Sequence, residues 1–404
     1  MDDMNALQTF LRKQIRFDRN ELSGAFGDMG TDIPLVVGLI AASGLDGAQV
    51  LIVYGIMQVL TALIYGIPMP VQPLKAVAVI VITQKISGNV IWGGGFSIGV
   101  IMLLLTFSGL INFLSRLIPL VVIRGVQMGL GIQLGMLALQ KYIPEGGISG
   151  YVLSIFAFFI IFALLGNRRL PPAFVVIFIG ILYGIFTFQP EVFSSLKKSF
   201  HFDFVFPKPN DILTGFFLLA IPQIPLSLAN SILATEQLIK DYFPEKTITS
   251  RKIAVTYSLL NIISSMLGGI PVCHGSGGMA GHYTFGARTG GSVLIYGLMF
   301  ITFGLVFGGK ANILLSFFPL PLLGVLLLFE ALALLTRITD VTNEKKNFLI
   351  ALIVGLCSAF LPYGYIVGMT VGAILYYSFS DRAYIHEILK YVIHKKVNRS
   401  LTFK

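Results

Sequence analysis

Long apolar segments, separated by short charged or glycine- and proline-rich stretches, follow one another along almost the whole chain. The apolar runs are continuous, without the alternation of a half-buried strand, and a membrane-crossing helix needs about 20 such residues. The pattern therefore predicts seven spans, a polar stretch and seven further spans. The predicted spans are residues 22–42, 48–67, 71–86, 96–115, 118–140, 149–166, 171–188, 211–238, 251–269, 272–287, 290–308, 311–335, 347–361 and 363–379.

The third and tenth spans, 71–86 and 272–287, are too short to cross about 30 Å of hydrocarbon as regular helices. Proline precedes each of them: Pro70 and Pro73 in the first case, Pro271 in the second. Proline fixes an extended backbone before a helix, and Pro73 suits the first turn of one. We therefore predict two half-helices that begin in the middle of the membrane.

Seven spans per half would place the second half in the membrane with the opposite orientation, as in an inverted repeat. Two short echoes agree: Ile33-Pro34-Leu35 with Ile224-Pro225-Leu226, and Pro70-Val71-Gln72 with Pro271-Val272-Cys273. The predicted fold class is an all-α polytopic membrane protein, a 7+7 inverted repeat whose half-helices meet at mid-membrane. Its predicted parts are an N-terminal segment 1–21, a first repeat 22–188, a linker 189–210, a second repeat 211–379 and a basic tail 380–404.

Composition supports the membrane assignment. The 404 residues are 55% hydrophobic and only 12% charged, with a mean hydropathy of +0.84, whereas a soluble chain carries about 25% charge. These values exclude a soluble enzyme, a coiled coil, a disulfide-stapled domain and a disordered chain, and the continuous runs argue against an outer-membrane barrel.

The positions of the basic residues explain the net charge of +10. They lie between spans and at the chain ends, without a basic domain for nucleic acid. With the N-terminus, the even-numbered connections and the C-terminus on one side, that side holds 21 Lys and Arg, the other side 6, and two lie within spans. This bias predicts cytoplasmic termini in a plasma or bacterial inner membrane. Residues 1–20 lack the apolar core of a cleavable signal peptide.

The half-helices are the candidate binding site. A helix that begins at mid-membrane exposes unsatisfied N–H groups and its positive dipole end, which suits an anionic ligand. The glycines at 275, 277 and 278 would let backbone amides approach that ligand closely. The alternative is that they only permit close helix packing, since Gly277 and Gly281 form a GxxxG pattern.

Ionisable residues inside the spans are functional candidates because they are costly in the membrane. Lys75 shares a helix face with Gln72, and it could contact the anion, pair with a nearby aspartate or reach the membrane surface. Asp28 and Asp32 lie four apart on one face, where one could be protonated or paired with Lys75 or Arg124. Proton or cation coupling is the first hypothesis for them; the alternative is that Asp28 orders the broken helix through nearby amides.

The eighth span is broken by Pro222 and Pro225, and it offers Gln223, Ser227 and Asn230 as neutral donors at helical spacing. Neutral donors suit an anion that must later be released.

Other motifs do not carry chemistry. Cys273 and Cys357 are too few for a disulfide framework, and with His274 and His282 they lack recognised metal-ligand spacing. His274 is instead a hydrogen-bond donor at the half-helix mouth, and His282 a packed residue. Residues Gly304 to Lys310 match the GxxxxGK part of a phosphate-binding loop, but Ala311 stands where that motif requires Ser or Thr. We expect no metal and no cofactor.

The sequence resembles the molybdate transporter family of plants and bacteria, a branch of the SulP-like sulfate permeases. The motifs that carry the resemblance are Phe26-Gly-Asp-Met-Gly-Thr-Asp-Ile-Pro-Leu35, Pro68-Met-Pro-Val-Gln-Pro-Leu-Lys-Ala76, Pro222-Gln-Ile-Pro-Leu226, Pro271-Val-Cys-His-Gly-Ser-Gly-Gly-Met-Ala-Gly281 and Phe285-Gly-Ala-Arg288. The similarity spans nearly the whole chain, although no regulatory domain follows the last span as it does in many SulP relatives.

The resemblance implies fourteen spans, of which 1–4 and 8–11 form a substrate-carrying core and 5–7 and 12–14 a gate or scaffold. It implies oxyanion binding between the third and tenth half-helices and leaves room for a homodimer. The residues expected to bind substrate are Gln72, Lys75, Gln223, His274, Gly275, Ser276 and Gly277. Asp28 and Asp32 are the coupling candidates, and the helix-breaking residues are Pro34, Pro70, Pro73, Pro222, Pro225 and Pro271.

The expected function is secondary transport of a tetrahedral dianion, molybdate first and sulfate second, and not enzymatic catalysis. The spans contain no HExxH motif and no paired catalytic carboxylates. Alternatives are a nucleobase–cation symporter on the same scaffold and an anion channel.

Overall fold

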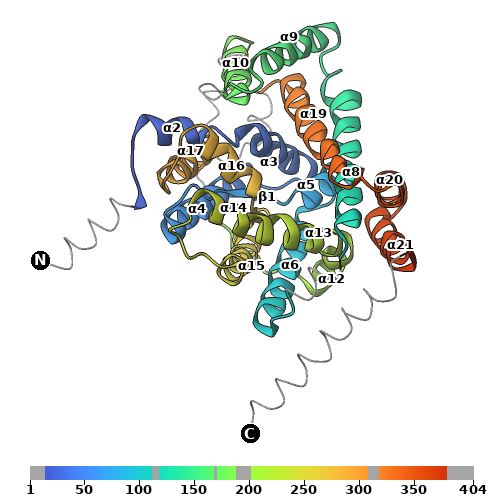
Figure 1. The fold of residues 1–404 in the computed structure, drawn as a ribbon. Helices are drawn as coiled ribbons and strands as arrows, with labels where there is room; N and C mark the ends of the chain where they lie inside the picture. Colours follow the sequence, from blue (N-terminus) through green and yellow to red (C-terminus); the bar gives the residue numbers. More distant parts are fainter. Residues whose placement is uncertain (1–13, 112–117, 168–170, 188–201, 308–317, 380–404) are drawn as a thin grey trace, which may run out of the picture. The chain divides into compact units, whose positions relative to one another are not determined.

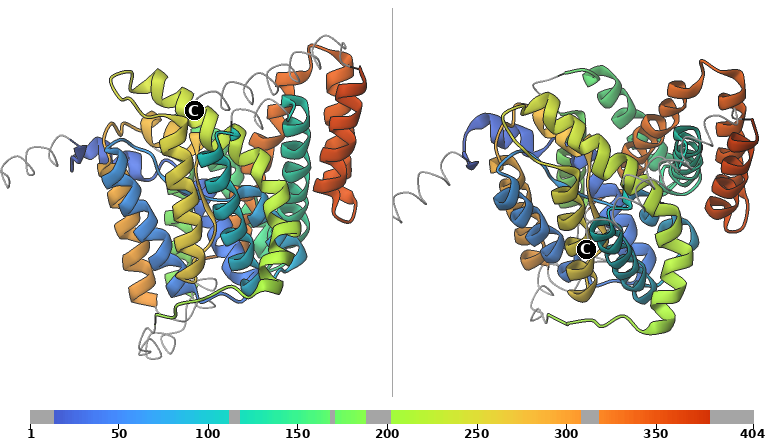
Figure 2. Two further views of the ribbon diagram at one scale, coloured as in Figure 1. Left: turned by 90° about the horizontal axis from the view of Figure 1, so that it is seen from below. Right: turned by 60° about the horizontal axis from the view of Figure 1, so that its bottom comes forward.

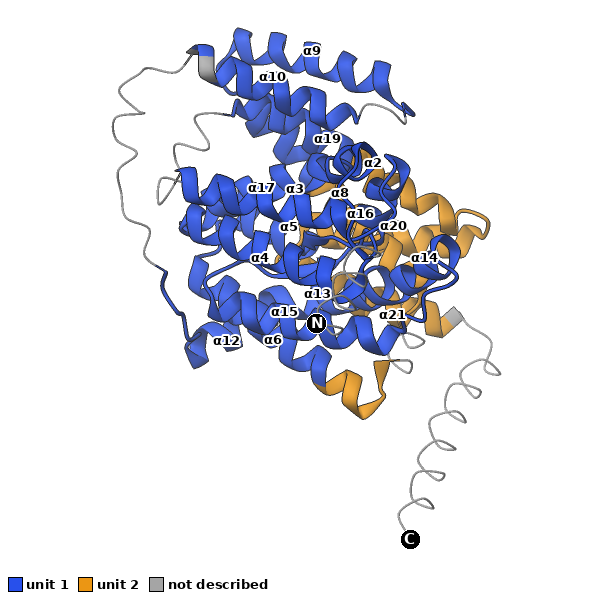
Figure 3. Cartoon of the chain, turned by 90° about the vertical axis from the view of Figure 1, so that its left-hand side faces the viewer, with its two compact units in different colours: residues 1–103, 134–330 blue, residues 104–133, 331–404 orange. Residues whose placement is uncertain are grey.

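A computed structural model describes residues 14–111, 118–167, 171–187, 202–307 and 318–379 (Figure 1). Residues 1–13 of the predicted N-terminal segment, 189–201 of the linker, the tail 380–404 and the pair Lys310–Ala311 lie outside the described residues. The chain divides into two compact units, coloured separately in Figure 3: unit 1 contains residues 1–103 and 134–330, and unit 2 contains 104–133 and 331–404.

Helices form almost everywhere that the sequence is apolar. The first predicted span is two helices, α2 (Arg19–Ala25) and α3 (Met29–Ser43), bent by 42° at the break between them. The elements that follow in the first half are α4 (Gly47–Tyr65), β1 (Val71–Pro73), α5 (Lys75–Gln84), α6 (Gly88–Ser108), α8 (Leu120–Leu137), η1 (Ala138–Tyr142), α9 (Ile148–Leu164) and α10 (Pro172–Thr187).

The second half begins with one long helical stretch interrupted by two π-helical turns. Its pieces are α12 (Pro209–Gly215), η2 (Phe216–Ala220), α13 (Ile221–Leu226), η3 (Ser227–Leu233) and α14 (Ala234–Tyr242). Then follow α15 (Ser250–Met266), β2 (Val272–His274), α16 (Ser276–Thr284), α17 (Gly291–Phe307), α19 (Leu320–Thr336), η4 (Arg337–Val341), α20 (Lys345–Phe360) and α21 (Gly364–Phe379).

The described part of the chain has five helices that are long and apolar enough to cross a membrane, and six if α2 and α3 count as one bent span. Several other apolar helices are 10 to 17 residues long. The protein is therefore a mostly helical integral membrane protein. Fourteen crossings remain a prediction, because the shorter helices do not reach the length that a regular span requires.

The prediction of an all-α protein missed one feature. The two proline-rich approaches are short strands that pair antiparallel, with Val71 opposite His274 and Pro73 opposite Val272. All residues of both strands are buried, and Figure 1 shows β1 among α4, α5, α14 and α16. Pro73 accordingly belongs to β1 instead of the first helical turn, and α5 begins at Lys75.

Helices α4 and α17 of unit 1 lie side by side in both views of Figure 2 and make extensive contact. Their approach depends on two facing glycines. A Cβ added to Gly297 would lie 2.7 Å from the carbonyl oxygen of Gly55, and one added to Gly55 would lie 2.5 Å from the carbonyl oxygen of Gly297. Small residues at helix crossings are the usual way in which membrane helices gain van der Waals contact.

Unit 2 has its own packing. Gly125 of α8 lies against Val354 of α20, and the amide of Gln133 donates to the carbonyl oxygens of Ser358 and Ala359 at 3.3 and 3.2 Å. Helix α21 packs against α20, and the hydroxyl of Tyr365 donates to Gln133.

We predict that Gly297→Leu separates α4 from α17 and lowers the stability of the detergent-purified protein by about 1–3 kcal/mol, the usual cost of overpacking. Thermal unfolding measures this effect. Leu305→Ala, at a position of α17 that is 60% exposed, is the control and should leave the midpoint nearly unchanged. Equal midpoints for both variants would contradict the glycine contact.

Candidate functional site

The paired strands are clamped by one amide side chain each. Gln58 of α4 accepts from the N–H of Val71 at 2.9 Å and donates to its carbonyl oxygen at 2.7 Å. Asn261 of α15 does the same for Val272, at 3.0 and 2.7 Å. Both amides are fully buried. Backbone groups that the short ladder leaves unpaired are thereby satisfied, as burial requires.

A tyrosine lies one helical turn before each clamp. The hydroxyl of Tyr54 is 2.6 Å from Oδ2 of Asp32 and from the carbonyl oxygen of Val71. The hydroxyl of Tyr257 is 2.7 Å from Oγ of Ser227. The same pattern of partners therefore occurs on both sides of the ladder, with a carboxylate on one side and a neutral hydroxyl on the other.

The first turn of α5 begins beside β2. The N–H of Leu74 donates to the carbonyl oxygen of Pro271 at 3.1 Å, and the N–H of Ala76 donates to Oε1 of Gln223 at 3.0 Å. Gln223 in turn donates to Ser227 at 3.1 Å. Gln223, predicted to bind substrate, therefore caps α5 in this state.

The first turn of α16 is more open. Among the described residues none accepts a hydrogen bond from the N–H groups of Ser276, Gly277 and Gly278. Gly277 is exposed, and a Cβ added to it would meet nothing within 4 Å. The positive end of α16 thus faces accessible space, which is the geometry of an anion site.

Asp28 and Gln72 lie directly beside this turn. Gln72 donates to Oδ1 of Asp28 at 2.7 Å, while Oδ2 of Asp28 has no partner among the described residues. A Cβ on Gly278 would overlap Oδ2 of Asp28, and one on Gly275 would overlap Oε1 of Gln72. The side chain of Asp28 makes no capping hydrogen bond to α3, and the amide that it contacts is that of Gln72.

Asp32 is completely buried one turn further along α3. Its Oδ2 accepts from Tyr54 at 2.6 Å and from Tyr296 at 3.1 Å, and its Oδ1 has no partner among the described residues. Both predicted coupling carboxylates therefore have one unpartnered oxygen in a buried position. An uncompensated buried charge is costly, so a proton or a cation at these oxygens would be stabilising.

The predicted pairing of Lys75 with Asp28 or Asp32 is wrong. Lys75 forms an ion pair with Glu330 of α19, and Oε2 of Glu330 accepts from the hydroxyl of Thr31 at 3.0 Å. The sequence did contain a signal for Glu330, which is the single charged residue between Lys310 and Arg337. Sequence reasoning missed it, although an ionisable group inside a span marks a functional candidate.

Arg124 does not pair with the aspartates of α3 either. Within unit 2 it forms an ion pair with Asp340 and donates to Oε1 of Gln127 at 2.8 Å.

Histidine and cysteine do not build a metal centre in the described part of the chain. The Nε2 of His274 is 2.9 Å from the hydroxyl of Thr256, and its ring meets the edge of Tyr65. Its side chain therefore contacts α4 and α15, a position that sequence alone could not give. His282 is buried against Tyr296 and lies 3.1 Å from Ser292, as expected of a packed residue. Cys273 and Cys357 are free.

The helix-breaking prolines occupy different positions. Pro34 lies inside α3 and Pro225 inside α13, while Pro222 is in the first turn of α13. Pro271 directly precedes β2, and Pro70 precedes β1.

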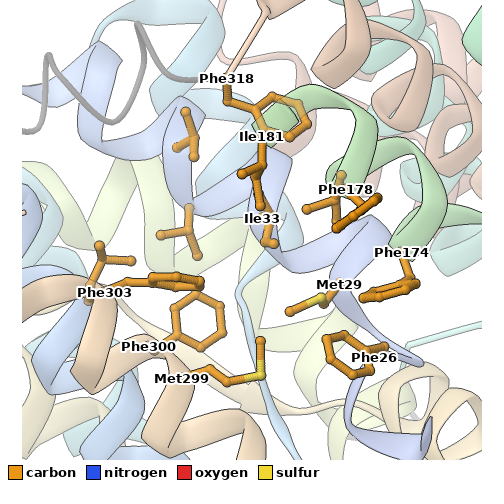
Figure 4. Close-up of a pocket in the computed structure, with 14 residues that line it drawn as sticks. Phe26, Met29, Ile33, Phe174, Phe178, Ile181, Met299, Phe300, Phe303 and Phe318 are labelled. Carbon is orange, nitrogen blue, oxygen red and sulfur yellow. The ribbon is translucent and has the colours of Figure 1, made fainter. Parts of the chain in front are cut away.

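A cavity of about 200 Å³ lies between α3, α10 and α17 (Figure 4). Its lining side chains are apolar, among them Phe26, Met29, Phe174, Phe178, Phe300 and Phe303. Without a donor on its walls, this cavity cannot compensate the desolvation of a dianion. The oxyanion site is therefore better sought at the first turn of α16.

Comparison with known proteins identifies the family. The family model described as "Molybdate transporter of MFS superfamily" matches residues 20–134 and 215–334. Molybdate transporter 2 of Arabidopsis thaliana is 33% identical over 422 residues, covering 91% of this chain and 89% of that protein. The chain belongs to the molybdate transporter family. The resemblance inferred from the motifs is confirmed, and the protein is a membrane transporter and not an enzyme.

Relatives outside land plants and solved structures extend the comparison. Molybdate transporter 1 of Chlamydomonas reinhardtii is 25% identical over 469 residues, covering 87% of this chain and 90% of that protein. The transmembrane domain of the cyanobacterium bicarbonate transporter BicA has a TM-score of 0.63 at 17% identity, over 89% of this chain and 98% of that chain. Murine Slc26a9 in the inward-facing state has a TM-score of 0.68 at 15% identity, over 89% and 68%. This molybdate transporter family member therefore has the fold of those anion transporters.

We predict that Gln58→Leu and Asn261→Leu each destabilise this family member by about 1–3 kcal/mol, because buried backbone groups of Val71 or Val272 lose their partners. Thermal unfolding in detergent measures the loss. Gln237→Leu on α14, where the amide is exposed and bonded to Asp241, is the control. If either clamp variant unfolded at the control's midpoint, the strands would not depend on that amide.

Proposed function

We propose that the protein is a secondary active transporter that imports a tetrahedral oxyanion, molybdate first and sulfate next. The observation that carries the proposal is the first turn of α16. Its N–H groups have no acceptor among the described residues, and Gly277 faces open space. The names of three curated relatives, each a molybdate transporter, favour molybdate as the substrate.

The surrounding residues give the site its remaining donors. Lys75 lies within electrostatic range of Asp28, which in turn touches Gly278 of α16. The ammonium of Lys75, the α16 amides, Ser276 and the amide of Gln72 would together supply charged and neutral donors to four oxygens. Gln223 would contribute through α5, and His274 and Gly275 would position the strand that leads into α16.

Import of a dianion needs an energy source. Moving two negative charges inward against 100 mV costs about 4.6 kcal/mol. We propose that protons carried by Asp28 and Asp32 offset this cost, because both have an unpartnered buried oxygen next to the anion site.

A 7+7 inverted repeat underlies this mechanism in our proposal. Its support is the repeated partner pattern: Tyr54 and Gln58 on one side of the ladder correspond to Tyr257 and Asn261 on the other. Asp32 corresponds to Ser227 by its contact with the tyrosine, and Asp28 and Gln223 lie four residues before them. This correspondence is about one helical turn from the one that the Ile-Pro-Leu echo indicates. Residues 22–188 and 211–379 would be the two repeats, joined by the linker 189–210.

In this proposal spans 1–4 and 8–11 carry the substrate past a scaffold formed by spans 5–7 and 12–14. Both termini, including the tail 380–404, would lie in the cytoplasm of a cell with a plasma or inner membrane, and a homodimer is compatible with the arrangement. A nucleobase symporter would need side-chain acceptors and aromatic stacking for a flat ring, which the donor-rich turn of α16 does not provide. A channel would show conductance far above carrier rates.

We predict that Gly277→Ala raises the KM for molybdate uptake by about tenfold or more, because the methyl group occupies the space through which the anion reaches the amides. Stability should be equal or higher, since alanine favours a helix over glycine by about 1 kcal/mol. Initial rates in proteoliposomes with labelled molybdate, and thermal unfolding of the same preparation, measure both effects. An unchanged KM would contradict binding of the anion at the first turn of α16.

We predict that an acidic exterior stimulates molybdate uptake by the wild-type protein, and that Asp28→Asn and Asp32→Asn each abolish this stimulation, because asparagine cannot carry the proton. Uptake into proteoliposomes with an imposed pH gradient is the measurement. Asp241→Asn, at an exposed position of α14, should behave as wild type. Full stimulation in both asparagine variants would exclude these residues as proton carriers.

A further inference from the structure

Glu330 lies on α19 in unit 1, and it is the only charged residue from residue 311 to 336. Its side chain is only 10% exposed, whereas that of its partner Lys75 is 29% exposed. The carboxylate is held at both oxygens, by the ammonium of Lys75 at one and by the hydroxyl of Thr31 at the other. Glu330 thus joins α19 to α5 and α3 at the edge of the candidate site.

The groups that hold this carboxylate are the kinds of donor that an oxyanion requires. A cation and a hydroxyl bind the two carboxylate oxygens, and the same two groups could bind two oxygens of a tetrahedral dianion. While Glu330 is in place, it uses the one hydrogen that the Thr31 hydroxyl can donate, and it neutralises the charge of the Lys75 ammonium. Among the described residues of α3, β1, α5, α13, β2 and α16, Lys75 is the only lysine or arginine.

The other titratable groups around this pair increase the competition. Asp28 and Asp32 of α3 also lie within electrostatic range of Lys75. Glu330 and Asp28 also repel each other. These carboxylates compete for one ammonium. An incoming dianion that binds Lys75 must therefore weaken or replace some of these interactions.

We propose that Glu330 is a resident carboxylate that competes with the transported oxyanion for Lys75 and Thr31. The inference rests on the proposed function and adds to it a residue that sets substrate affinity. In the empty transporter Glu330 neutralises Lys75 and fastens α19 to α3 and α5. Oxyanion binding displaces the carboxylate and so releases α19 from α3 and α5. Occupancy of the site is thereby linked to the contact between these helices.

The test compares the Kd for labelled molybdate on the purified full chain in wild type and Glu330→Gln. Glutamine has nearly the same size but no charge, so it should compete less for Lys75. We expect binding to tighten by about two- to fivefold, which is the range for removing a partly exposed ion pair. A merely structural role would weaken binding or leave it unchanged.

Two further variants identify the cause. Lys75→Gln in the Glu330→Gln background should reverse the gain, because the cation that the anion acquires is then absent. Asp340→Asn removes the carboxylate that pairs with Arg124 in unit 2, and it should leave the Kd unchanged.

Glu330→Asp keeps the charge but shortens its reach, and it should give a smaller tightening. It carries the test if Glu330→Gln does not fold, and an equal or larger Kd in the folded variant would overturn the proposal. The same holds for an equal or larger Kd in folded Glu330→Gln. Wild type that binds no molybdate would contradict the proposed function itself, so the two failures are distinguishable.

Discussion

Buried backbone groups without hydrogen-bond partners are the constraint on which this structure depends. The chain breaks its helices at β1 and β2, in the buried interior, where water cannot satisfy the freed peptide groups. The ladder pairs some of these groups, and Gln58 and Asn261 pair others. The first turn of α5 is capped by Gln223, but that of α16 is not capped by any described residue. A ligand can therefore complete the terminus of α16.

Charge is distributed around this terminus in an unusual way for an anion transporter. One lysine, Lys75, pairs with Glu330 and lies within electrostatic range of Asp28 and Asp32. A site with this composition would repel a dianion if every carboxylate stayed ionised and in place. Proton uptake by the aspartates and displacement of Glu330 are two ways to remove that repulsion, and they are compatible with each other. Both make anion affinity depend on the state of the protein, as alternating access requires.

The sequence allowed prediction of the features that local chemistry determines. Prolines predicted extended backbone before the two short helices, and the helices begin at Lys75 and Ser276, close to the expected positions. The motifs were specific enough to identify the family. Strand pairing and the clamps by Gln58 and Asn261 were not predictable, because they depend on which helices lie beside the strands. The partner predicted for Lys75, an aspartate such as Asp28, was wrong for the same reason. The residue that contacts Lys75 is Glu330, which lies 255 residues away in the sequence.

The central claim is that the oxyanion binds at the first turn of α16, beside Lys75. An experimental structure determined with tungstate, an electron-dense tetrahedral analogue of molybdate, tests it most directly. We predict a single strong density peak within hydrogen-bond distance of the N–H groups of Gly277 and Gly278. A peak in the apolar cavity of Figure 4, or one on the protein surface with none at α16, would contradict the account.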